Sequence, residues 1–369
     1  MSYKRVLTIQ DISCVGQCSL TVALPIISAC GIETSVLPSA VLSTHTMGFT
    51  GFTFRDLTED MPGICAHWKK EGLTFDGIYT GYLGSAKQIE YVKDIVAATA
   101  AEGCLVVIDP AMADNGKLYP AFDMAFVEEM KKLCAGANYL LPNITEACLL
   151  TGMEYRTEYD EAYIDALVTG LRDLGAENVI LTGVSYSKGH TGVLVFENGE
   201  KQYYEHQQIA GGIHGTGDIY ASAFVGAKLR GKTAYEAAKI AANYVVECIL
   251  ESKKDPDHTY GARFEPVLGK LIGIHRSAGI HRNAGIHHRG TGFHRSSRVR
   301  GHRRGHRSIS AAALVCIVDD VSKFIKQHNA VRCIGTADHN LARHQCAHQD
   351  HCYDSSKNTK LHFLFLPIC

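Results

Sequence analysis

The sequence predicts an α/β fold in which helices cover both faces of a mainly parallel sheet. Short runs rich in β-branched residues alternate with longer helix-like runs, which is the pattern of βαβ units. The run Cys104–Ile108 is almost continuously apolar, as strands are when both faces of a parallel sheet are covered. One Asn-Gly pair, Asn198-Gly199, lies between two apolar runs and predicts a single antiparallel hairpin.

The first strand is predicted at Arg5–Gln10, followed by a polar turn that starts at Asp11 and a helix-like run over Ser19–Cys30. Ligands of such folds bind at the carboxyl ends of the strands. Asp11 and Ser13 are therefore candidate substrate-binding residues. A plain turn or helix-capping role would also explain Asp11.

A second strand is predicted at Ile32–Leu37. The following segment, Ser43–Phe52, mixes hydroxyls, glycines and aromatic residues without helical or strand periodicity. Such a segment is typical of a lid over a pocket, although an ordinary surface loop is the simpler alternative.

The third strand, Phe75–Thr80, precedes a helix predicted from Ser85 to Ala101. The next strand, Cys104–Ile108, ends in a segment that contains Asp109 and Asp114. Carboxylates at the carboxyl end of a strand are well placed to hold Mg²⁺, directly or through water.

A short strand at Asn138–Leu141 leads to Asn143 and Glu146 at a helix start. Residues three apart on a helix can face one site. The same pair also matches a capping box, which needs no ligand. Beyond it the sequence predicts a strand at Val179–Gly183 and a hairpin of Thr191–Phe196 with Gln202–His206.

The turn Gly215-Thr216-Gly217-Asp218 precedes an Ala-rich run without a helix breaker until Gly231. Glycines let the backbone turn and approach a ligand, and the unpaired amides of a helix start attract anions. Asp218 cannot be there to bind an anion. It is a candidate base that takes a proton from a hydroxyl while phosphate is held beside it. The alternative is a Gly-rich turn with Asp218 as a helix cap.

A second glycine pattern, Gly226–Thr233, matches the letters of the P-loop motif. A P-loop requires a preceding strand, whereas the residues before this one predict a helix. Gly231 is expected to end that helix, and Thr233 to start the next, which extends to Ser252.

Composition limits the classes of protein to which the chain can belong. The chain has 369 residues, 46% hydrophobic and 20% charged, with a net charge of -1. Its 13 cysteines show no regular spacing, which favours reduced thiols over a disulfide framework. No run is long enough for a membrane helix, and the N-terminus does not resemble a signal peptide. We therefore expect a cytoplasmic protein that does not enter membranes.

The C-terminal part differs in composition. Nine arginines, seven histidines and no acidic residue occur in residues 273–307, partly as a six-residue repeat, and Cys- and His-rich sequence follows. Such a run cannot bury a core, so residues 273–369 are expected to be disordered or to be a non-native segment read in a wrong frame. Nucleic-acid binding through this basic tail is an alternative.

Taken together, several motifs resemble those of the bacterial pyridoxal/pyridoxamine (vitamin B6) kinases of the ribokinase superfamily, over residues 1–272. The resemblance implies a ribokinase-like three-layer α/β sandwich, formed as a homodimer. The motifs that carry it are Gln10–Gly16, Ser43–Thr46, Tyr79–Tyr82, Asp109-Pro110, Asn143–Glu146 and Gly215–Asp218.

The resemblance also implies roles for individual residues. Asp218 would activate the hydroxymethyl group of the vitamer, and the backbone of Gly215, Thr216 and Gly217 would form the anion hole. ATP and Mg²⁺ would be required, with a monovalent cation such as K⁺ as a further cofactor. The remaining residues would act in sets: Asp109, Asp114 and Glu146 on metal ions, Asp109, Tyr119, Asn143 and Thr182 on ATP, and Asp11, Ser13, Thr46 and Tyr82 on the pyridine ring.

Departures from the family pattern leave alternatives open. Asp11 stands where the animal enzymes carry serine, which favours a cationic vitamer such as pyridoxamine. A hydroxymethylpyrimidine kinase is the main alternative, although that family usually has cysteine where this chain has His214. A sugar kinase lacks support in the N-terminal region, and the presence of Asp218 argues against an inactive kinase fold used for binding.

Overall fold

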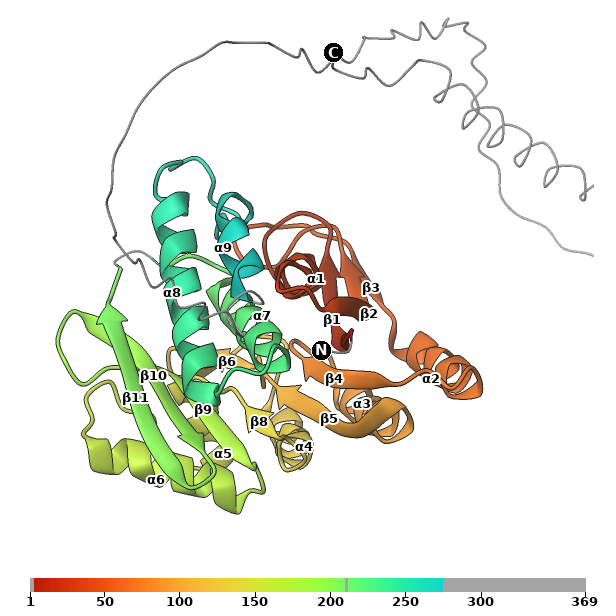
Figure 1. Cartoon of the computed structure of the whole chain (residues 1–369), viewed down its shortest axis with the longest axis horizontal. Helices are drawn as coiled ribbons and strands as arrows, with labels where there is room; N and C mark the ends of the chain where they lie inside the picture. The colour runs from red at the N-terminus through yellow and green to blue at the C-terminus, as the bar shows by residue number, and fades with distance from the viewer. Residues whose placement is uncertain (1–2, 210–211, 275–369) are drawn as a thin grey trace, which may run out of the picture. The chain divides into compact units, whose positions relative to one another are not determined.

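The computed structural model of the chain describes residues 3–209 and 212–274. In these residues a nine-stranded sheet has the order β11-β10-β9-β8-β5-β4-β1-β2-β3 (Figure 1). A separate small hairpin is formed by β6 and β7. The strands are β1 (Arg5–Ser13), β2 (Glu33–Leu42), β3 (Phe54–Asp56), β4 (Phe75–Thr80), β5 (Ala100–Ile108), β6 (Ala113–Asp114), β7 (Lys117–Leu118), β8 (Tyr139–Leu140), β9 (Asn178–Val184), β10 (His190–Glu197) and β11 (Glu200–Gln207).

The central strands β2, β1, β4, β5, β8 and β9 are parallel, whereas β3, β10 and β11 pair antiparallel. This arrangement confirms the predicted mainly parallel sheet with one antiparallel hairpin. The hairpin turn has Asn198 at φ 53° and Gly199 at φ 89°, the positive values that an Asn-Gly turn adopts. Because the central strands are parallel, the carboxyl ends of β1, β4, β5, β8 and β9 meet at one edge of the sheet.

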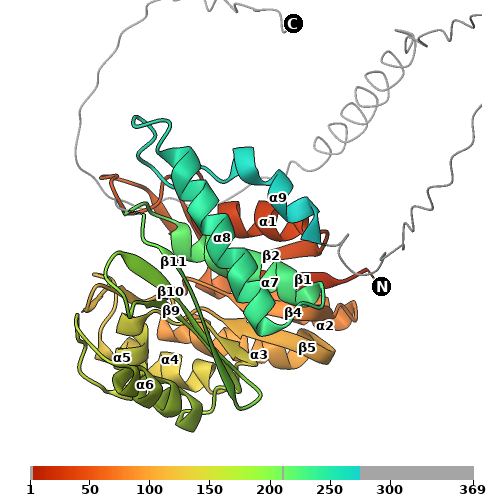
Figure 2. The ribbon, with the colours of Figure 1, turned by 60° about the vertical axis from the view of Figure 1, so that its left-hand side comes forward.

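Helices cover both faces of the sheet, as expected for three layers (Figure 2). One face packs against α1, α7, α8 and α9, and the other against α2 to α6, each around its own apolar cluster. The helices are α1 (Leu20–Ala29), α2 (Met61–Lys70), α3 (Ala86–Thr99), α4 (Met124–Cys134), α5 (Ile144–Thr151), α6 (Glu161–Asp173), α7 (Thr216–Leu229), α8 (Ala234–Ser252) and α9 (Gly269–Ile272), with short 3₁₀ turns at Thr58–Asp60 and Glu265–Val267.

Helix α7 is buried on nearly all sides, from Ile219 to Ala227. Its small alanines let α1 and α8 approach closely on either side. The helix ends before Gly231, which has φ +84°, and Thr233 caps α8 in a capping box with Glu236. These features confirm that Gly226–Thr233 is a helix end and a helix start rather than a P-loop.

The first strand is longer than predicted. The prediction of a turn at Asp11 is wrong, because β1 continues to Ser13, with Ile12 beside Val41 and Ser13 beside Leu42. The register shifts between Gln10 and Ile12, so Asp11 lies at an irregularity of the strand. Such irregularities change the direction of a side chain, and this one is adjacent to the candidate site.

Several elements have no counterpart in the sequence-based prediction. These are the edge strand β3, the small hairpin β6–β7 and helices α2, α4, α6 and α9. The strands among them are only two or three residues long, too short for a recognisable alternation. Helices α4 and α6 do carry helical signals, since an aspartate caps each one and their buried residues recur at helical spacing.

Other predictions concern the cysteines, the membrane and the tail. The eight cysteines in the described part of the chain are free, as expected for reduced thiols. No helix in residues 3–209 or 212–274 is long and apolar enough to cross a membrane. Residues 275–369, which contain nearly all of the predicted tail, lie outside the described residues.

Candidate active site

The start of α7 requires a glycine for steric reasons. Gly215 is the N-cap of the helix and has φ +81°. A Cβ atom at this position would lie 1.9 Å from the carbonyl oxygen of Gln17, far inside contact distance. The turn therefore packs directly on the backbone that follows β1.

A late segment of the chain, residues 258–262, supports this turn from the other side. The amide of Ala262 donates to the carbonyl of His214 at 3.1 Å, and the amide of Gln17 donates to the carbonyl of Tyr260 at 3.2 Å. The buried ring of His45 also contacts the carbonyl of Tyr260, at 3.0 Å. Parts of the chain that are far apart in sequence thus fix the position of Gly215.

The first turn of α7 offers backbone amides to a ligand. Its first intrahelical hydrogen bond runs from the amide of Ile219 to the carbonyl of Gly215. The amides of the three preceding residues therefore have no partner within the helix. A Cβ atom at Gly217 would meet no atom within 4 Å, so the space beside this turn is open. Unpaired amides at an open helix start suit an anion.

Asp218 lies in this same turn, and its carboxylate contacts the start of α1. Its Oδ2 atom accepts a hydrogen bond of 3.0 Å from the amide of Ser19. Burial, supplemented by the negative charge of Asp11, raises the pKa of Asp218 to about 6, and the Ser19 hydrogen bond opposes this shift. A carboxylate with this pKa is ionised at neutral pH and can accept a proton there.

Asp11 is buried and is held by two serines. Its carboxylate accepts hydrogen bonds from Ser13 Oγ at 3.2 Å and from Ser19 Oγ at 2.5 Å. Burial raises the pKa of Asp11, whereas these hydrogen bonds lower it. The half-buried Tyr82 lies close enough for the charge of Asp11 to raise its pKa, after the larger effect of burial. Ser13 therefore contacts Asp11, and Tyr82 lies near the same carboxylate.

Asp109, Glu146 and Asp218 form a cluster of negative charge at the carboxyl edge of the sheet. Burial first, and then the charges of Glu146 and Asp218, raise the pKa of Asp109 well above its usual range. Burial raises the pKa of Glu146 to about 7 against the effect of its backbone hydrogen bonds. Within the described residues, no Lys or Arg forms an ion pair with these three acids. A buried acid whose pKa is raised by two neighbouring acids fits a cation as an additional partner.

Asn143 and Glu146 form the capping box that the sequence suggested as an alternative role. They also hold the loop after β5. The side-chain amide of Asn143 donates to the carbonyl of Ala113 at 2.8 Å, and Glu146 Oε1 accepts from the amide of Met112 at 3.1 Å. The second carboxylate oxygen of Glu146 accepts from the amide of Asn143 at 2.9 Å. Both residues therefore organise the backbone next to Asp109.

The other predicted residues are distributed more widely. Tyr119 is near the acid cluster, since burial and the charges of Glu146 and Asp109 raise its pKa. Thr182 on β9 forms a bridge with Asn143. Asp114 is exposed and accepts hydrogen bonds from the neighbouring Asn115.

No described contact joins Thr46, which is exposed, to the rest of the site. Among residues 3–209 and 212–274, no group of three or more His, Cys, Asp or Glu side chains is close enough to hold a metal ion. A divalent cation would need phosphate oxygens and water as further ligands, as Mg²⁺ usually does beside a nucleotide.

Two residues near the site received no role of their own in the sequence analysis. Ser19 contacts both Asp11 and Asp218, although its only sequence signal is its position at a helix start. Tyr79 on β4 is completely buried, and burial followed by the charges of Asp109 and Asp218 raises its pKa well above the usual range. A tyrosine within a strand is indistinguishable from an ordinary core residue in the sequence.

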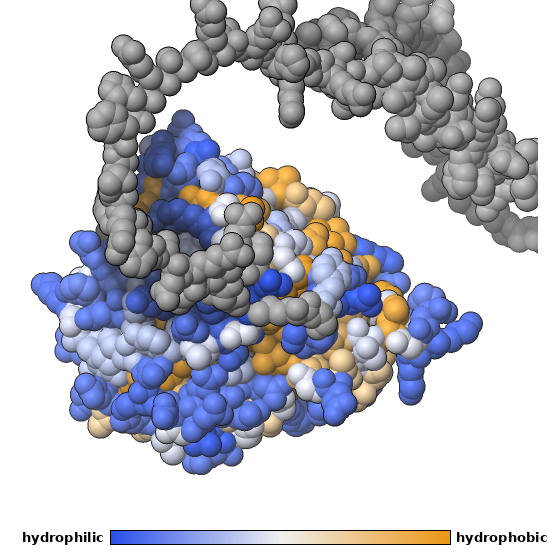
Figure 3. All heavy atoms as spheres, in the orientation of Figure 1, coloured by the Kyte–Doolittle hydropathy of each residue, from blue (hydrophilic) through white to orange (hydrophobic). Residues whose placement is uncertain are grey.

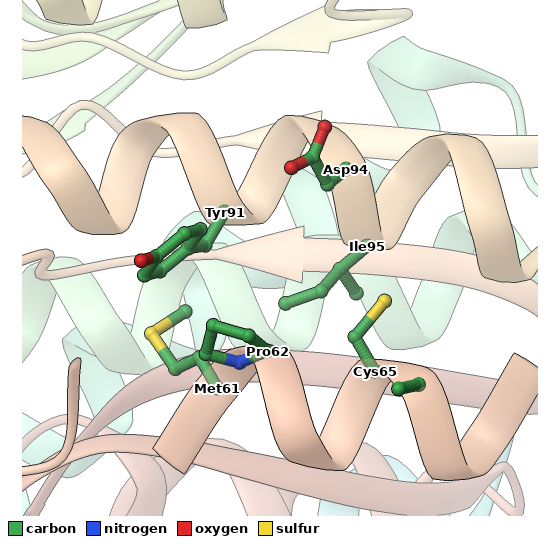
Figure 4. A pocket seen from close by; sticks show the side chains of 7 residues that line it. Met61, Pro62, Cys65, Tyr91, Asp94 and Ile95 are labelled. Atoms are coloured by element: carbon green, nitrogen blue, oxygen red, sulfur yellow. The ribbon is translucent and has the colours of Figure 1, made fainter. Parts of the chain in front are cut away.

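A hollow elsewhere on the surface is separate from this site. It lies between helices α2 and α3 and is lined by Met61, Cys65, Tyr91 and Ile95 among others (Figure 4). No predicted site residue lines it.

Comparisons with known proteins identify a kinase family. The family described as phosphomethylpyrimidine kinase matches residues 30–262. A pyridoxine/pyridoxal/pyridoxamine kinase of Bordetella pertussis is 27% identical over 261 residues, which cover 68% of this chain and 89% of the relative.

Solved structures of kinases also resemble this chain. A candidate phosphomethylpyrimidine kinase of Bacteroides thetaiotaomicron, crystallised with pyridoxal, is 35% identical and has a TM-score of 0.69, covering 73% of this chain and 96% of that one. The pyridoxal kinase of Lactobacillus plantarum is 29% identical with a TM-score of 0.69, covering 74% and 98%. The ribokinase-like fold expected from the sequence is thereby confirmed.

Proposed function

The chain belongs to the phosphomethylpyrimidine kinase family, and from that premise we propose that it phosphorylates the hydroxymethyl group of a B6 vitamer: pyridoxal, pyridoxamine or pyridoxine. It is an ATP-dependent small-molecule kinase of the ribokinase superfamily. The product would be the 5′-phosphate of the vitamer.

One observation carries the proposal: Asp218 occupies the same helical turn as the unpaired amides before Ile219. In this mechanism Asp218 takes the proton of the hydroxymethyl group while the hydroxymethyl oxygen attacks the γ-phosphorus of ATP. The bond between that phosphorus and the oxygen bridging it to the β-phosphate breaks, and ADP leaves. The amides of Gly215, Thr216 and Gly217 then face the oxygens of the migrating phosphoryl group, where negative charge accumulates. Base and anion hole are held by one rigid helix start, so their spacing is fixed before the substrates arrive.

The acid cluster supplies the cation site in this proposal. Asp109 and Glu146 would hold Mg²⁺ together with ATP oxygens, Asp114 would contribute through water, and the metal would neutralise phosphate charge. Asn143, Tyr119 and Thr182 would line the nucleotide phosphates. A monovalent cation such as K⁺ would be a further cofactor.

The ring of the vitamer would contact the group around Asp11. Asp11 and Ser13 offer a carboxylate and a hydroxyl at the end of β1, and Tyr82 offers an aromatic face. Thr46 would reach the ring from the 43–52 loop. A buried carboxylate attracts a cationic ring or amine, so pyridoxamine is expected among the good substrates.

A hydroxymethylpyrimidine kinase is the second candidate. The description of the matching family favours it, as does a hydroxymethylpyrimidine/phosphomethylpyrimidine kinase of Bacillus subtilis that is 28% identical over 217 residues. That match covers 57% of this chain and 76% of the relative. The two substrates share an aromatic ring with a hydroxymethyl group, so one site geometry serves both.

We also propose that the enzyme is a homodimer. Leu24 on α1 is 41% exposed and Ile272 on the adjoining α9 is 48% exposed. Figure 3 shows hydrophobic residues gathered on the face where α1 lies. Sedimentation velocity of the purified chain measures the mass directly, and a monomer at micromolar concentration would refute the dimer.

The test of function measures ATP-dependent phosphorylation of pyridoxal, pyridoxamine, pyridoxine and hydroxymethylpyrimidine by the full chain. We expect turnover with at least one B6 vitamer and a higher kcat/KM for it than for hydroxymethylpyrimidine. The Asp218→Asn variant should bind the substrate but lose at least about 100-fold in kcat, the low end for a general base. Preference for hydroxymethylpyrimidine would transfer the proposal to the second candidate.

A further inference from the structure

Ser19 stands between the two carboxylates of the proposed site. Its hydroxyl donates to Asp11 Oδ1 at 2.5 Å, and its backbone amide donates to Asp218 Oδ2 at 3.0 Å. We propose that Ser19 is a positioning residue that holds Asp11 and Asp218 as one unit, so that ring recognition and hydroxyl activation share an anchor. This inference rests on the proposed function.

The backbone of Ser19 is strained. It has φ 54° and ψ -134°, a region in which glycine is favoured. The other non-glycine residues with positive φ among the described residues are Asn115 and Asn198, and asparagine tolerates such values in turns. Glycine would remove the strain at Ser19 but would also remove the hydroxyl. The strain is therefore compensated by something that only the side chain provides.

Helix capping does not explain the serine. Ser19 is the N-cap of α1, but its side chain makes no capping hydrogen bond. The hydroxyl is directed to Asp11 instead, and both side chains are almost completely buried, at 6% and 5% exposure. A short hydrogen bond from a buried hydroxyl to a carboxylate is among the stronger ones in proteins.

The arrangement links two functions through one rigid residue. Moving Ser19 displaces its hydroxyl and its amide together, so the carboxylates of Asp11 and Asp218 cannot be repositioned independently. Misplacement of a reacting group by about 1 Å can reduce turnover roughly 100-fold. The kcat should therefore depend on the hydroxyl of Ser19, although that hydroxyl touches Asp11 rather than Asp218.

The test compares Ser19→Gly with Ser19→Ala in the full chain. Ser19→Gly relieves the strained φ and keeps the amide, so its unfolding temperature should equal or exceed that of the wild type. Its kcat should nevertheless fall by about 10-fold or more, because Asp11 no longer fixes the position of the residue. Ser19→Ala keeps the strain and should lose both kcat and thermal stability. A Ser19→Gly enzyme with the kcat of the wild type would overturn the proposal.

Ser13→Ala is the matched control. It removes the other hydroxyl bound to Asp11, and Ser13 makes no hydrogen bond to Asp218. Its effect should fall mainly on KM for the alcohol, whereas the effect of Ser19→Gly should fall mainly on kcat. If both variants changed kcat and KM in the same way, the proposed role of Ser19 in positioning Asp218 would be contradicted.

A double-mutant cycle with Asp11→Ala measures the link itself. When Asp11 is absent the hydroxyl has no acceptor, so Ser19→Gly should reduce kcat much less than in the wild-type background. Full additivity would refute the coupling. All comparisons use whichever alcohol the wild type phosphorylates. If the proposed substrate is wrong, the wild-type enzyme will not phosphorylate it. If the proposed role of Ser19 is wrong, the wild type will be active and only the variants will depart from the expected pattern.

Discussion

Two glycines that are two residues apart should respond to alanine in opposite ways. Gly215 has φ +81°, and a Cβ there would lie 1.9 Å from the carbonyl oxygen of Gln17. The left-handed backbone alone costs an alanine roughly 1–2 kcal/mol, and the overlap forces the turn away from Gln17. For a domain of this size, about 2 kcal/mol corresponds to a decrease of roughly 4–8 °C in Tm.

Gly217 provides the matched control. A Cβ there meets nothing within 4 Å, and the residue is helical, so alanine should raise stability by up to about 1 kcal/mol. The added methyl group nevertheless enters the open space proposed for the phosphoryl group. We therefore expect Gly215→Ala to lose stability and activity together, and Gly217→Ala to lose activity alone.

The assay combines thermal unfolding with ATP-dependent phosphorylation of the preferred alcohol. Displacement of the anion hole by about 1 Å predicts a loss near 100-fold in kcat for Gly215→Ala. Gly217→Ala should lose at least about 10-fold, because part of the electrostatic stabilisation is blocked. If Gly217→Ala retained full activity, the phosphoryl group would not pass beside this turn. If Gly215→Ala were as stable as the wild type, the contact with Gln17 would not hold the turn.

Three further outcomes are expected. Because the pKa of Asp218 is raised to about 6 and only its ionised form accepts a proton, kcat/KM should fall as the pH decreases below about 6; a profile that is flat down to pH 4 would exclude this residue as the base. Burial raises the pKa of Glu146 above its unfolded value, so the folded state binds the proton more tightly and stability decreases as the pH rises from about 4.5 to 7. Measurements of Tm against pH should show a weaker decrease for Glu146→Gln than for the wild type. Parallel curves for the two proteins would contradict the pKa shift. Deletion of residues 275–369 should leave kcat and KM unchanged, because every predicted site residue precedes residue 219; salt-sensitive nucleic-acid binding that disappears with the deletion would instead assign a function to the basic tail.

Much of the fold follows from local sequence signals. The strand Phe75–Thr80, the Asn-Gly hairpin and the start of α7 lie where their residue patterns predict them. In each case the determining forces are short-range: alternating or continuous apolar residues, positive φ at a turn, and unpaired amides at a helix start. Helices α4 and α6 carry comparable local signals, an aspartate N-cap followed by apolar residues at helical spacing, so a weak sequence pattern does not explain why they were not predicted.

The candidate site was predictable where function depends on residue type, and less so where it depends on backbone geometry. Asp218 and Asp109 could be identified because each follows a recognisable signal, a glycine turn before a helix and the end of an apolar strand. The irregularity at Asp11 and the positive φ of Ser19 result from tertiary packing. Serine has no intrinsic preference for such a conformation, so nothing in the sequence around Ser19 indicates it.

The support of the Gly215 turn by residues 258–262 has a consequence for biosynthesis. Translation proceeds from the N-terminus, so Gln17 leaves the ribosome roughly ten to fifty seconds before the segment that pairs with it. Once Asp218 has been synthesised, the nascent chain contains Asp11, Asp109, Glu146 and Asp218 but still lacks residues 258–262, which hold the Gly215 turn. Termination between Asp218 and Tyr260 would therefore yield a chain that has all four acids but lacks the segment that fixes the proposed anion hole.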